Sequence, residues 1–107
     1  MKLLLITLAF VPFIFAGSPQ SVSVMTSASI GTASAVALAA NGNRGYLLIQ
    51  NNGSVTCQVK FGSAITSTEG VQLTAGQYYE PWVAPKEAVY MKCAGAATPI
   101  QLVEGNW

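Results

Sequence analysis

The sequence contains no histidine and no aspartate, and this absence excludes several kinds of catalytic site. A Ser-His-Asp or Cys-His arrangement cannot be built without histidine. Zinc and calcium sites need clustered ligands, whereas the few cysteines and glutamates of this chain are scattered. The glycines of residues 42–45 have neither the spacing nor the following helix of a phosphate-binding loop. We therefore expect no catalytic residues, no metal ligands and no cofactor.

Charge is also scarce, since charged residues make up 8% of the chain and the formal net charge is +1. Such a chain has no long-range attraction for nucleic acid or for an anionic membrane. Low net charge favours association, so the composition indicates a protein that works in an assembly. With 107 residues, the chain is long enough for one small domain.

Residues 1–17 form an apolar leader, in which a single lysine precedes an unbroken apolar run. The run is shorter than the roughly 20 residues that span a bilayer comfortably. Its length fits the core of an export signal, and Ile14-Phe15-Ala16 is a tolerable cleavage site. We expect the leader to be either a signal peptide that is removed or a membrane anchor that is retained.

Residues 18–44 are rich in serine, alanine, threonine and glycine. Apolar residues alternate with polar ones in residues 21–26 and, more weakly, in residues 32–39, which predicts one or two strands. A short helix is the alternative for the second, alanine-rich piece. We interpret this segment as an N-terminal arm in front of a β-sandwich that starts at residue 45.

Residues 45–61 contain two apolar runs on either side of Asn51-Asn52-Gly53, a pattern that predicts a β-hairpin. A two-residue turn would mix apolar and polar side chains on each face. A three-residue loop with Gly53 in the left-handed conformation leaves one face wholly apolar, and this register is the prediction. The apolar face then holds Leu47, Ile49, Val55, Cys57, Val59 and Phe61, and Tyr46 and Leu48 lie on the opposite face.

Short strands are predicted at residues 71–74, 87–93 and 99–104, of which 87–93 alternates most clearly, and residues 77–80 follow a turn at Ala75-Gly76. Pro81 and Pro85 bracket Trp82, so this piece must be an edge or a loop, because proline cannot donate to a strand ladder. Seven or eight short strands without a helix after residue 17 predict an all-β fold. The expected architecture is a single small antiparallel β-sandwich, jelly-roll or Ig-like, with a small barrel as the alternative.

Cys57 and Cys93 both fall on the apolar side of their predicted strands, so both should point into the core. They can be two buried thiols that act as small hydrophobes. They can also form a disulfide, which export would permit. In the chain-entropy model, closing a loop of 36 residues adds about 3–4 kcal/mol of stability. Both interpretations stay open at this stage.

Aromatic side chains on an outer face can bind sugar rings or a partner protein. The predicted interaction surface consists of Tyr46, Leu48, Tyr79 and Trp82. Edge packing or core filling is the alternative for each aromatic residue. Trp82 lies in a loop between two prolines and is the hardest to explain as a core residue.

Several segments between residues 43 and 105 resemble a family of small bacteriophage virion proteins. These segments are residues 43–51, 59–62, 70–76, 79–81, 84–85, 88–90 and 102–105. The resemblance implies a short β-sandwich with a capsid-associated, fibre-like or decoration role. It transfers no binding residues, because the shared positions belong to turns and strands. The leader departs from the family, whose members generally lack one.

The resemblance implies a non-enzymatic structural subunit located in a virion, or exported or membrane-associated in a bacterial host. Its expected partners are further copies of itself and other virion proteins, with membrane contact through residues 1–17 as an option. Nucleic acid and small-molecule ligands are not expected. The alternative functions are a secreted bacterial module that binds glycan or protein, and a small membrane-anchored envelope protein.

Overall fold

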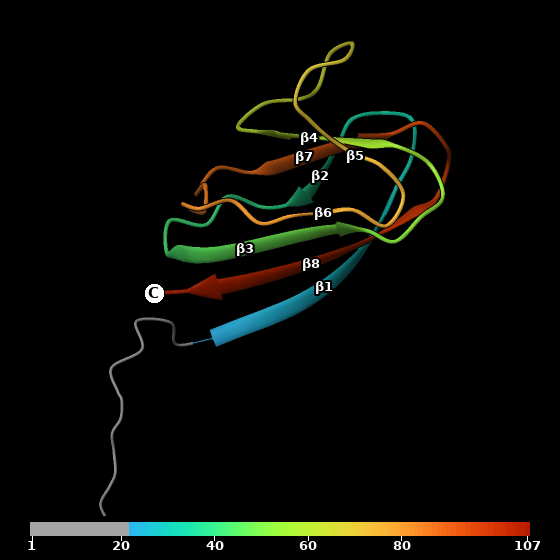
Figure 1. Cartoon of the computed structure of the whole chain (residues 1–107). Helices are drawn as coiled ribbons and strands as arrows, with labels where there is room; N and C mark the ends of the chain where they lie inside the picture. Colours follow the sequence, from blue (N-terminus) through green and yellow to red (C-terminus); the bar gives the residue numbers. More distant parts are fainter. Residues whose placement is uncertain (1–21) are drawn as a thin grey trace, which may run out of the picture.

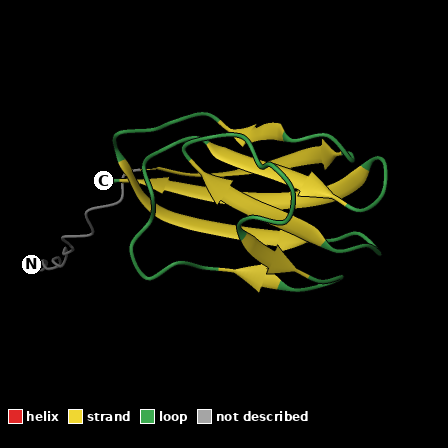
Figure 2. Ribbon diagram, turned by 90° about the horizontal axis from the view of Figure 1, so that it is seen from above, coloured by secondary structure: helices red, strands yellow, loops and turns green. Residues whose placement is uncertain are grey.

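The structure is a computed structural model that describes residues 22–107, so the predicted leader lies outside the described residues. This part of the chain forms eight strands and no helix. Sheet 1 has the order β1 (Val22–Ile30), β8 (Thr98–Asn106), β3 (Arg44–Asn51) and β6 (Tyr78–Tyr79). Sheet 2 has the order β2 (Ala35–Leu38), β7 (Val89–Cys93), β4 (Cys57–Phe61) and β5 (Val71–Leu73). All neighbours are antiparallel, and the strands lie in two layers (Figure 2), which agrees with a small β-sandwich.

The core lies between the two sheets and is built by alternation along each strand. β7 buries Val89, Met91 and Cys93 and leaves the residues between them partly exposed, as the period of two in its sequence predicts. The buried cluster draws on both sheets and on one loop. It contains Ile30, Leu47, Ile49, Cys57, Val59, Leu73, Ala84, Val89, Met91, Cys93, Ile100 and Leu102.

The predicted hairpin of residues 45–61 is wrong, although the face assigned to each apolar residue is largely right. β3 pairs with β8 and β6, whereas β4 pairs with β7 and β5, so the two strands belong to different sheets. Leu47 and Ile49 are buried on β3, and Cys57 and Val59 are buried on β4. The alternation reports which face is covered, and it cannot tell a neighbour in the same sheet from a strand in the facing sheet.

The side chain of Asn51 explains why this turn signal does not form a hairpin. Asn51 is fully buried, and its amide oxygen accepts a hydrogen bond from the Gly53 N–H at 2.9 Å. Its amide nitrogen donates to the carbonyl of Val55 at 2.7 Å and to that of Leu73 at 3.0 Å. These hydrogen bonds stabilise a turn after Asn51 that leads the backbone from sheet 1 to sheet 2. Gly53 is not among the glycines with positive φ, so the predicted left-handed conformation is also wrong.

The boundary expected at residue 45 does not separate two parts of the fold. β1 pairs with β8 over its whole length, and β2 pairs with β7, so residues 22–38 supply one strand to each sheet. The alanine-rich piece is the strand β2, and the helical alternative does not hold. Figure 1 shows β1 beside β8 along the outside of sheet 1.

One connection stays within a sheet, and every other connection passes from one sheet to the other. The exception is the loop of residues 62–70 between β4 and β5. Gly70 in this loop has a φ of 97°, and a Cβ atom there would lie 2.3 Å from the Val59 carbonyl oxygen. Glycine is therefore required where this hairpin closes.

Candidate interaction surfaces

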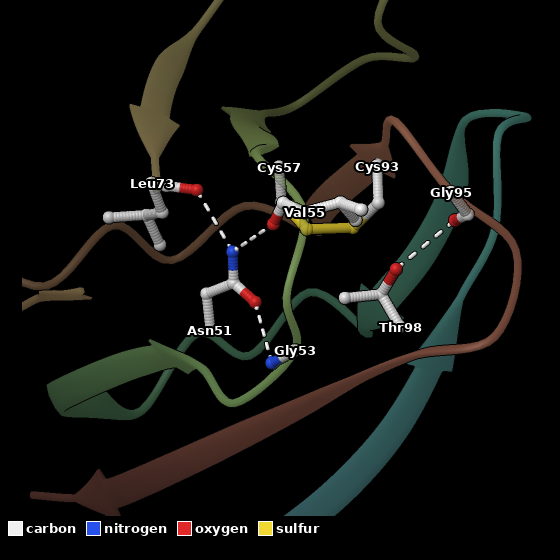
Figure 3. The surroundings of a disulfide bond; sticks show 8 residues. All are labelled: Asn51, Gly53, Val55, Cys57, Leu73, Cys93, Gly95 and Thr98. Atoms are coloured by element: carbon white, nitrogen blue, oxygen red, sulfur yellow. Dashed lines mark hydrogen bonds between the residues drawn. A yellow bond between two sulfur atoms is a disulfide. The ribbon is translucent and has the colours of Figure 1, made fainter. Parts of the chain in front are cut away.

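The two ends of the sandwich are built differently, and β3 runs from one to the other. We call the end that contains Asn51, Cys57 and Cys93 the disulfide end. Cys57 and Cys93 are direct cross-strand neighbours on β4 and β7, with their Cα atoms 4.0 Å apart, and they form a disulfide within sheet 2 (Figure 3). The predicted inward orientation of both residues is confirmed, and the disulfide is the interpretation that holds.

The opposite end, which we call the Arg44 end, is organised around a buried guanidinium. Arg44 begins β3 and its side chain has no exposed surface. The pairing of β3 with β8 shifts register between Arg44 and Tyr46, so Gly45 is an extra residue. This bulge turns Arg44 into the interior, whereas simple alternation would place it on the outer face with Tyr46.

The Arg44 guanidinium ties two loops to the end of β3. Its Nη1 donates to the carbonyls of Pro85 at 2.6 Å and Glu87 at 2.9 Å, and its Nη2 donates to the carbonyl of Ala39 at 2.8 Å. In return, the Lys86 ammonium donates to the Arg44 carbonyl at 3.0 Å. The loop between β6 and β7 is thereby held on a rigid strand, as the planar fork of arginine permits.

Glu104 on β8 supplies the counter-charge for Arg44. Its Oε2 lies 2.8 Å from the Arg44 Nε, and the same oxygen accepts a hydrogen bond from the amide of Asn41 at 2.9 Å. Asn41 also donates to the side-chain oxygen of Asn106 at 2.7 Å. The charge of Arg44 is therefore compensated by Glu104, and the carboxylate is hydrogen-bonded as well. A buried ion pair is tolerated only when both conditions are met.

Tyr46 and Glu80 form a second polar contact at this end, on the outer side of sheet 1. The phenol of Tyr46 donates to the Glu80 carboxylate at 2.5 Å. This hydrogen bond, with partial burial and the nearby negative charge, raises the pKa of Tyr46 above its ordinary value. Together with Pro81 and Trp82 the two residues line an open hollow of about 290 Å³.

Trp82 and Trp107 are the most prominent apolar groups of the Arg44 end. Trp82 is 100% exposed, and Trp107 at the end of the chain is 58% exposed. Both line a second, smaller hollow with Gly45 and Lys86. A Cβ atom on Gly45 would lie 2.6 Å from the Trp107 indole, so the glycine makes room for that ring.

The structure brings together only part of the surface predicted from sequence. Tyr46 and Trp82 meet around one hollow, and Leu48 lies two residues from Tyr46 on the same face of β3. Tyr79 is paired opposite the buried Ile49 and packs against the core, with its ring centroid 6.3 Å from that of Phe61. Tyr79 therefore does not lie on the surface formed by the other three residues.

An apolar row crosses the outer face of sheet 1. Leu48 on β3 is paired with Val103 on β8, and Val103 is paired with Met25 on β1. Residues in such cross-strand positions lie side by side on one face. Met25, at the end of the row, is 69% exposed. The row thus continues onto the strand at the edge of the sheet.

β1 forms that edge, and it differs from the three other edge strands. β1 has nine residues, without a charge, a proline or a shift in its pairing with β8. β6 has two residues and β5 has three, while β2 has four and an irregular register. Among the described strands none pairs with the second edge of β1. Short, charged or irregular edges resist further pairing, and β1 has none of these protections.

The outer side of sheet 2 carries a polar loop. Lys60 on β4 forms an ion pair with Glu69, whose pKa is lowered to about 2 by this contact and by hydrogen bonds from Thr66. The Lys92 ammonium donates to the carbonyl of Ser67 at 3.2 Å. Because the folded-state pKa of Glu69 is depressed, its small contribution to stability is present at neutral pH and is lost as the pH falls toward 2.

Residues 22–107 contain no group of three or more histidine, cysteine, aspartate or glutamate side chains that could hold a metal ion. No helix in this part of the chain is long and apolar enough to cross a membrane. Comparisons of the chain with models of protein families, with curated proteins and with solved structures give no match.

Sequence reasoning missed the role of Arg44, which it placed in the N-terminal arm of residues 18–44. The signal was the glycine at position 45 inside a strand pattern, because such glycines often mark a bulge. It also missed the edge of β1, since a strand edge becomes visible only when the order of the strands is known.

Proposed function

We propose that this protein is a non-enzymatic structural subunit of a bacteriophage virion that contacts further copies of itself and neighbouring capsid proteins. The observation that carries the proposal is the long, uncharged and unprotected edge of β1. An exposed edge of this kind is a template for pairing with another chain. A free monomer would gain nothing from such an edge and would risk aggregation.

The strand order supports the jelly-roll form of the sandwich. In an Ig-like sandwich the first two strands are neighbours in one sheet. Here β1 and β2 lie in different sheets, and the orders β1-β8-β3-β6 and β2-β7-β4-β5 are those of eight strands wound as a jelly roll. Jelly rolls occur in viral capsid domains and in lectins, so the fold is compatible with the proposal and does not determine the function.

The self-contact that we propose joins β1 to β1 of a second copy in antiparallel fashion. An identical strand pairs with itself around a two-fold axis, which closes the contact. Sheet 1 then continues from one copy into the next, and the two rows that end in Met25 approach each other on its outer face. The row supplies apolar area in addition to the backbone hydrogen bonds of the edge.

Sedimentation of residues 18–107 at micromolar concentration tests this proposal. We expect a closed oligomer for the unaltered chain. Met25→Lys places like charges close together at the proposed contact and should weaken association at least about tenfold, which is 1.4 kcal/mol. Gln72→Lys adds the same charge to β5, the edge of sheet 2, and should leave association unchanged. A monomer at all concentrations would contradict the proposal.

A glycan-binding module is the second candidate, and the hollow beside Trp82 favours it. Tyr46 and Trp82 offer aromatic faces there, and Glu80 offers a carboxylate already oriented by the Tyr46 hydroxyl. Pockets with a few fixed polar groups between apolar side chains are typical of small-ligand sites. A monomer that binds an oligosaccharide, and loses that binding on Trp82→Ala, would establish this function and exclude the first.

A further inference from the structure

We propose that in the full chain the Arg44 end of the sandwich lies against a lipid bilayer, with Trp82, Val83 and Trp107 in the interfacial layer. This inference goes beyond the structural role proposed above, since it assigns a second surface and a different partner. It describes the unpaired full chain, because an antiparallel β1 pair would point the Arg44 ends of its two copies in opposite directions, and both could not lie on one bilayer.

The first support is the distribution of exposed apolar side chains. Trp82, Val83 and Trp107 are all more than half exposed and lie around one hollow at the Arg44 end. The described loops of the disulfide end, residues 31–34, 52–56, 74–77 and 94–97, contain no exposed large hydrophobic residue, although Val36 and Tyr78 on the adjoining strands are exposed. A concentration of exposed apolar groups at one end marks a contact site. Indole rings are favoured at the boundary between lipid and water, because they are apolar with one polar N–H group.

The second support is the place where the apolar leader joins the fold. β1 begins at the Arg44 end, since Val22 is paired with Asn106 and Asn106 is also paired with Arg44. Four residues, 18–21, separate the leader from β1, and they can span at most about 14 Å. A leader held in a bilayer therefore keeps the Arg44 end, and not the disulfide end, next to the lipid surface. Figure 1 shows the start of β1 beside the C-terminus, where Trp107 lies.

The third support is the way in which the surface is held and charged. Arg44 donates to the carbonyls of Pro85 and Glu87, so the loop that contains Trp82 is fixed at the residues that follow Trp82. Arg44 itself is buried and paired with Glu104, and it offers no charge to lipid headgroups. Among the residues that line the two hollows, Lys86 and Glu80 offset each other. Contact should therefore depend on apolar burial rather than on anionic lipid.

These three observations favour a bilayer over the other partners. The hollows at Trp82 are open, and the ring of Trp82 projects fully into solvent rather than lining an enclosed groove. A lipid surface can take up such a ring without an enclosing pocket. Neither a glycan nor a protein partner would account for the leader entering the fold at this end.

The test uses tryptophan fluorescence, because the two tryptophans of the chain both lie at the Arg44 end. The full chain is reconstituted in phosphatidylcholine vesicles at a protein-to-lipid ratio low enough to keep copies of the chain unpaired. We expect blue-shifted emission, several-fold less quenching by aqueous iodide than for free N-acetyltryptophanamide, and quenching by lipids brominated on the upper acyl chain. Trp82→Phe and Trp107→Phe each leave one indole, and each remaining indole should behave in the same way.

A matched control places the only tryptophan at the disulfide end. In the double Trp82→Phe, Trp107→Phe background, Ala96→Trp puts an indole in the exposed connection between β7 and β8. This indole should stay accessible to iodide and should not be quenched by brominated lipid. Water-like emission from Trp82 and Trp107 in vesicles would overturn the inference, and so would equal protection at both ends. A blue shift caused by soluble oligosaccharide without lipid would assign the surface to a glycan and would also overturn it.

Discussion

The two ends of β3 differ in the buried polar side chain that fixes the neighbouring segments. Each end buries a polar side chain that donates to backbone carbonyls of other chain segments, Asn51 at the disulfide end and Arg44 at the other. The neutral amide of Asn51 lies at the end that the disulfide closes. No large apolar side chain is exposed in the described loops of that end. The charged guanidinium serves an end that carries Trp82 and Trp107. One end is thus closed by a covalent bond, whereas the other holds a candidate contact surface in place.

The largest loss of stability is expected when the buried guanidinium is removed. Arg44→Met leaves the Glu104 carboxylate and the carbonyls of Pro85 and Glu87 without their partner. Breaking one side of a buried ion pair costs about 3–5 kcal/mol, and we expect a loss of this size in denaturant unfolding of residues 18–107. Lys86→Met at the same end, an exposed position, should cost less than about 1.5 kcal/mol. Equal losses for the two variants would contradict the role given to Arg44.

Loss of the disulfide should have the second-largest effect on stability. Replacing both Cys57 and Cys93 by alanine releases a loop of 36 residues, for which the chain-entropy model gives about 3–4 kcal/mol. Unfolding with and without reductant measures the same difference in the unaltered chain. If the Arg44 end is independent of the disulfide, the loss should add to that of an Arg44 variant. A reduced protein as stable as the oxidised one would show that closure of this end does not depend on the bond.

Asn51→Ala should have an intermediate effect. The carbonyls of Val55 and Leu73 lose their donor, and a buried group left unsatisfied costs about 1–3 kcal/mol. Asn52→Ala is the matched control, because that neighbour is exposed, and its cost should be within about 0.5 kcal/mol of zero. Denaturant unfolding at neutral pH distinguishes the two. A neutral Asn51→Ala would mean that the turn between the sheets does not rely on this side chain.

Gly45→Ala should have a local effect at the Arg44 end. The added methyl group would meet the Trp107 indole, which can shift because more than half of its surface is exposed. We expect a change in the emission of Trp107 with a loss of stability below about 1 kcal/mol. The same substitution at Gly42, where a Cβ atom meets nothing within 4 Å, should leave the emission unchanged.

The smallest effect concerns the phenol of Tyr46. Its pKa is raised above 10.0 by the hydrogen bond to Glu80, so this phenol should ionise at a higher pH than a free tyrosine in an ultraviolet titration. A raised folded-state pKa means that the contribution of the bond to stability is present below pH 10 and is lost as the pH rises through the folded value. Glu80→Gln should bring the titration of Tyr46 back toward the ordinary value. An unshifted Tyr46 in the unaltered chain would exclude the contact.

The sequence was sufficient for the class of fold and for most of the buried faces, because strand alternation records burial directly. Leu47, Ile49, Cys57 and Val59 all face inward as predicted. It was insufficient for strand pairing, since Asn51-Asn52-Gly53 serves a hairpin and a crossing between sheets equally well. Arg44 escaped prediction because the bulge at Gly45 reverses the alternation, and only the pairing with β8 reveals it.

The same limit applies to the candidate surfaces. Trp82 could be recognised from the two prolines around it, and it is indeed fully exposed. Tyr79 could not be told from Tyr78 by composition, although the pairing of β6 with β3 sets Tyr79 opposite the buried Ile49. The free edge of β1 depends on which strand ends up outermost, and that follows from contacts between residues far apart in sequence.

Hydrogen exchange at the amides of β1 tests the structural role most directly. In an antiparallel pair, alternate amides of a strand point to its neighbour and the others point away. One set within residues 22–30 is therefore bonded to β8 in every state, and the other set is bonded only if a second chain pairs with the edge. The account predicts that both sets are protected at concentrations where residues 18–107 associate, and that the outer set loses protection on dilution. Rapid exchange of the outer set at every concentration would contradict it.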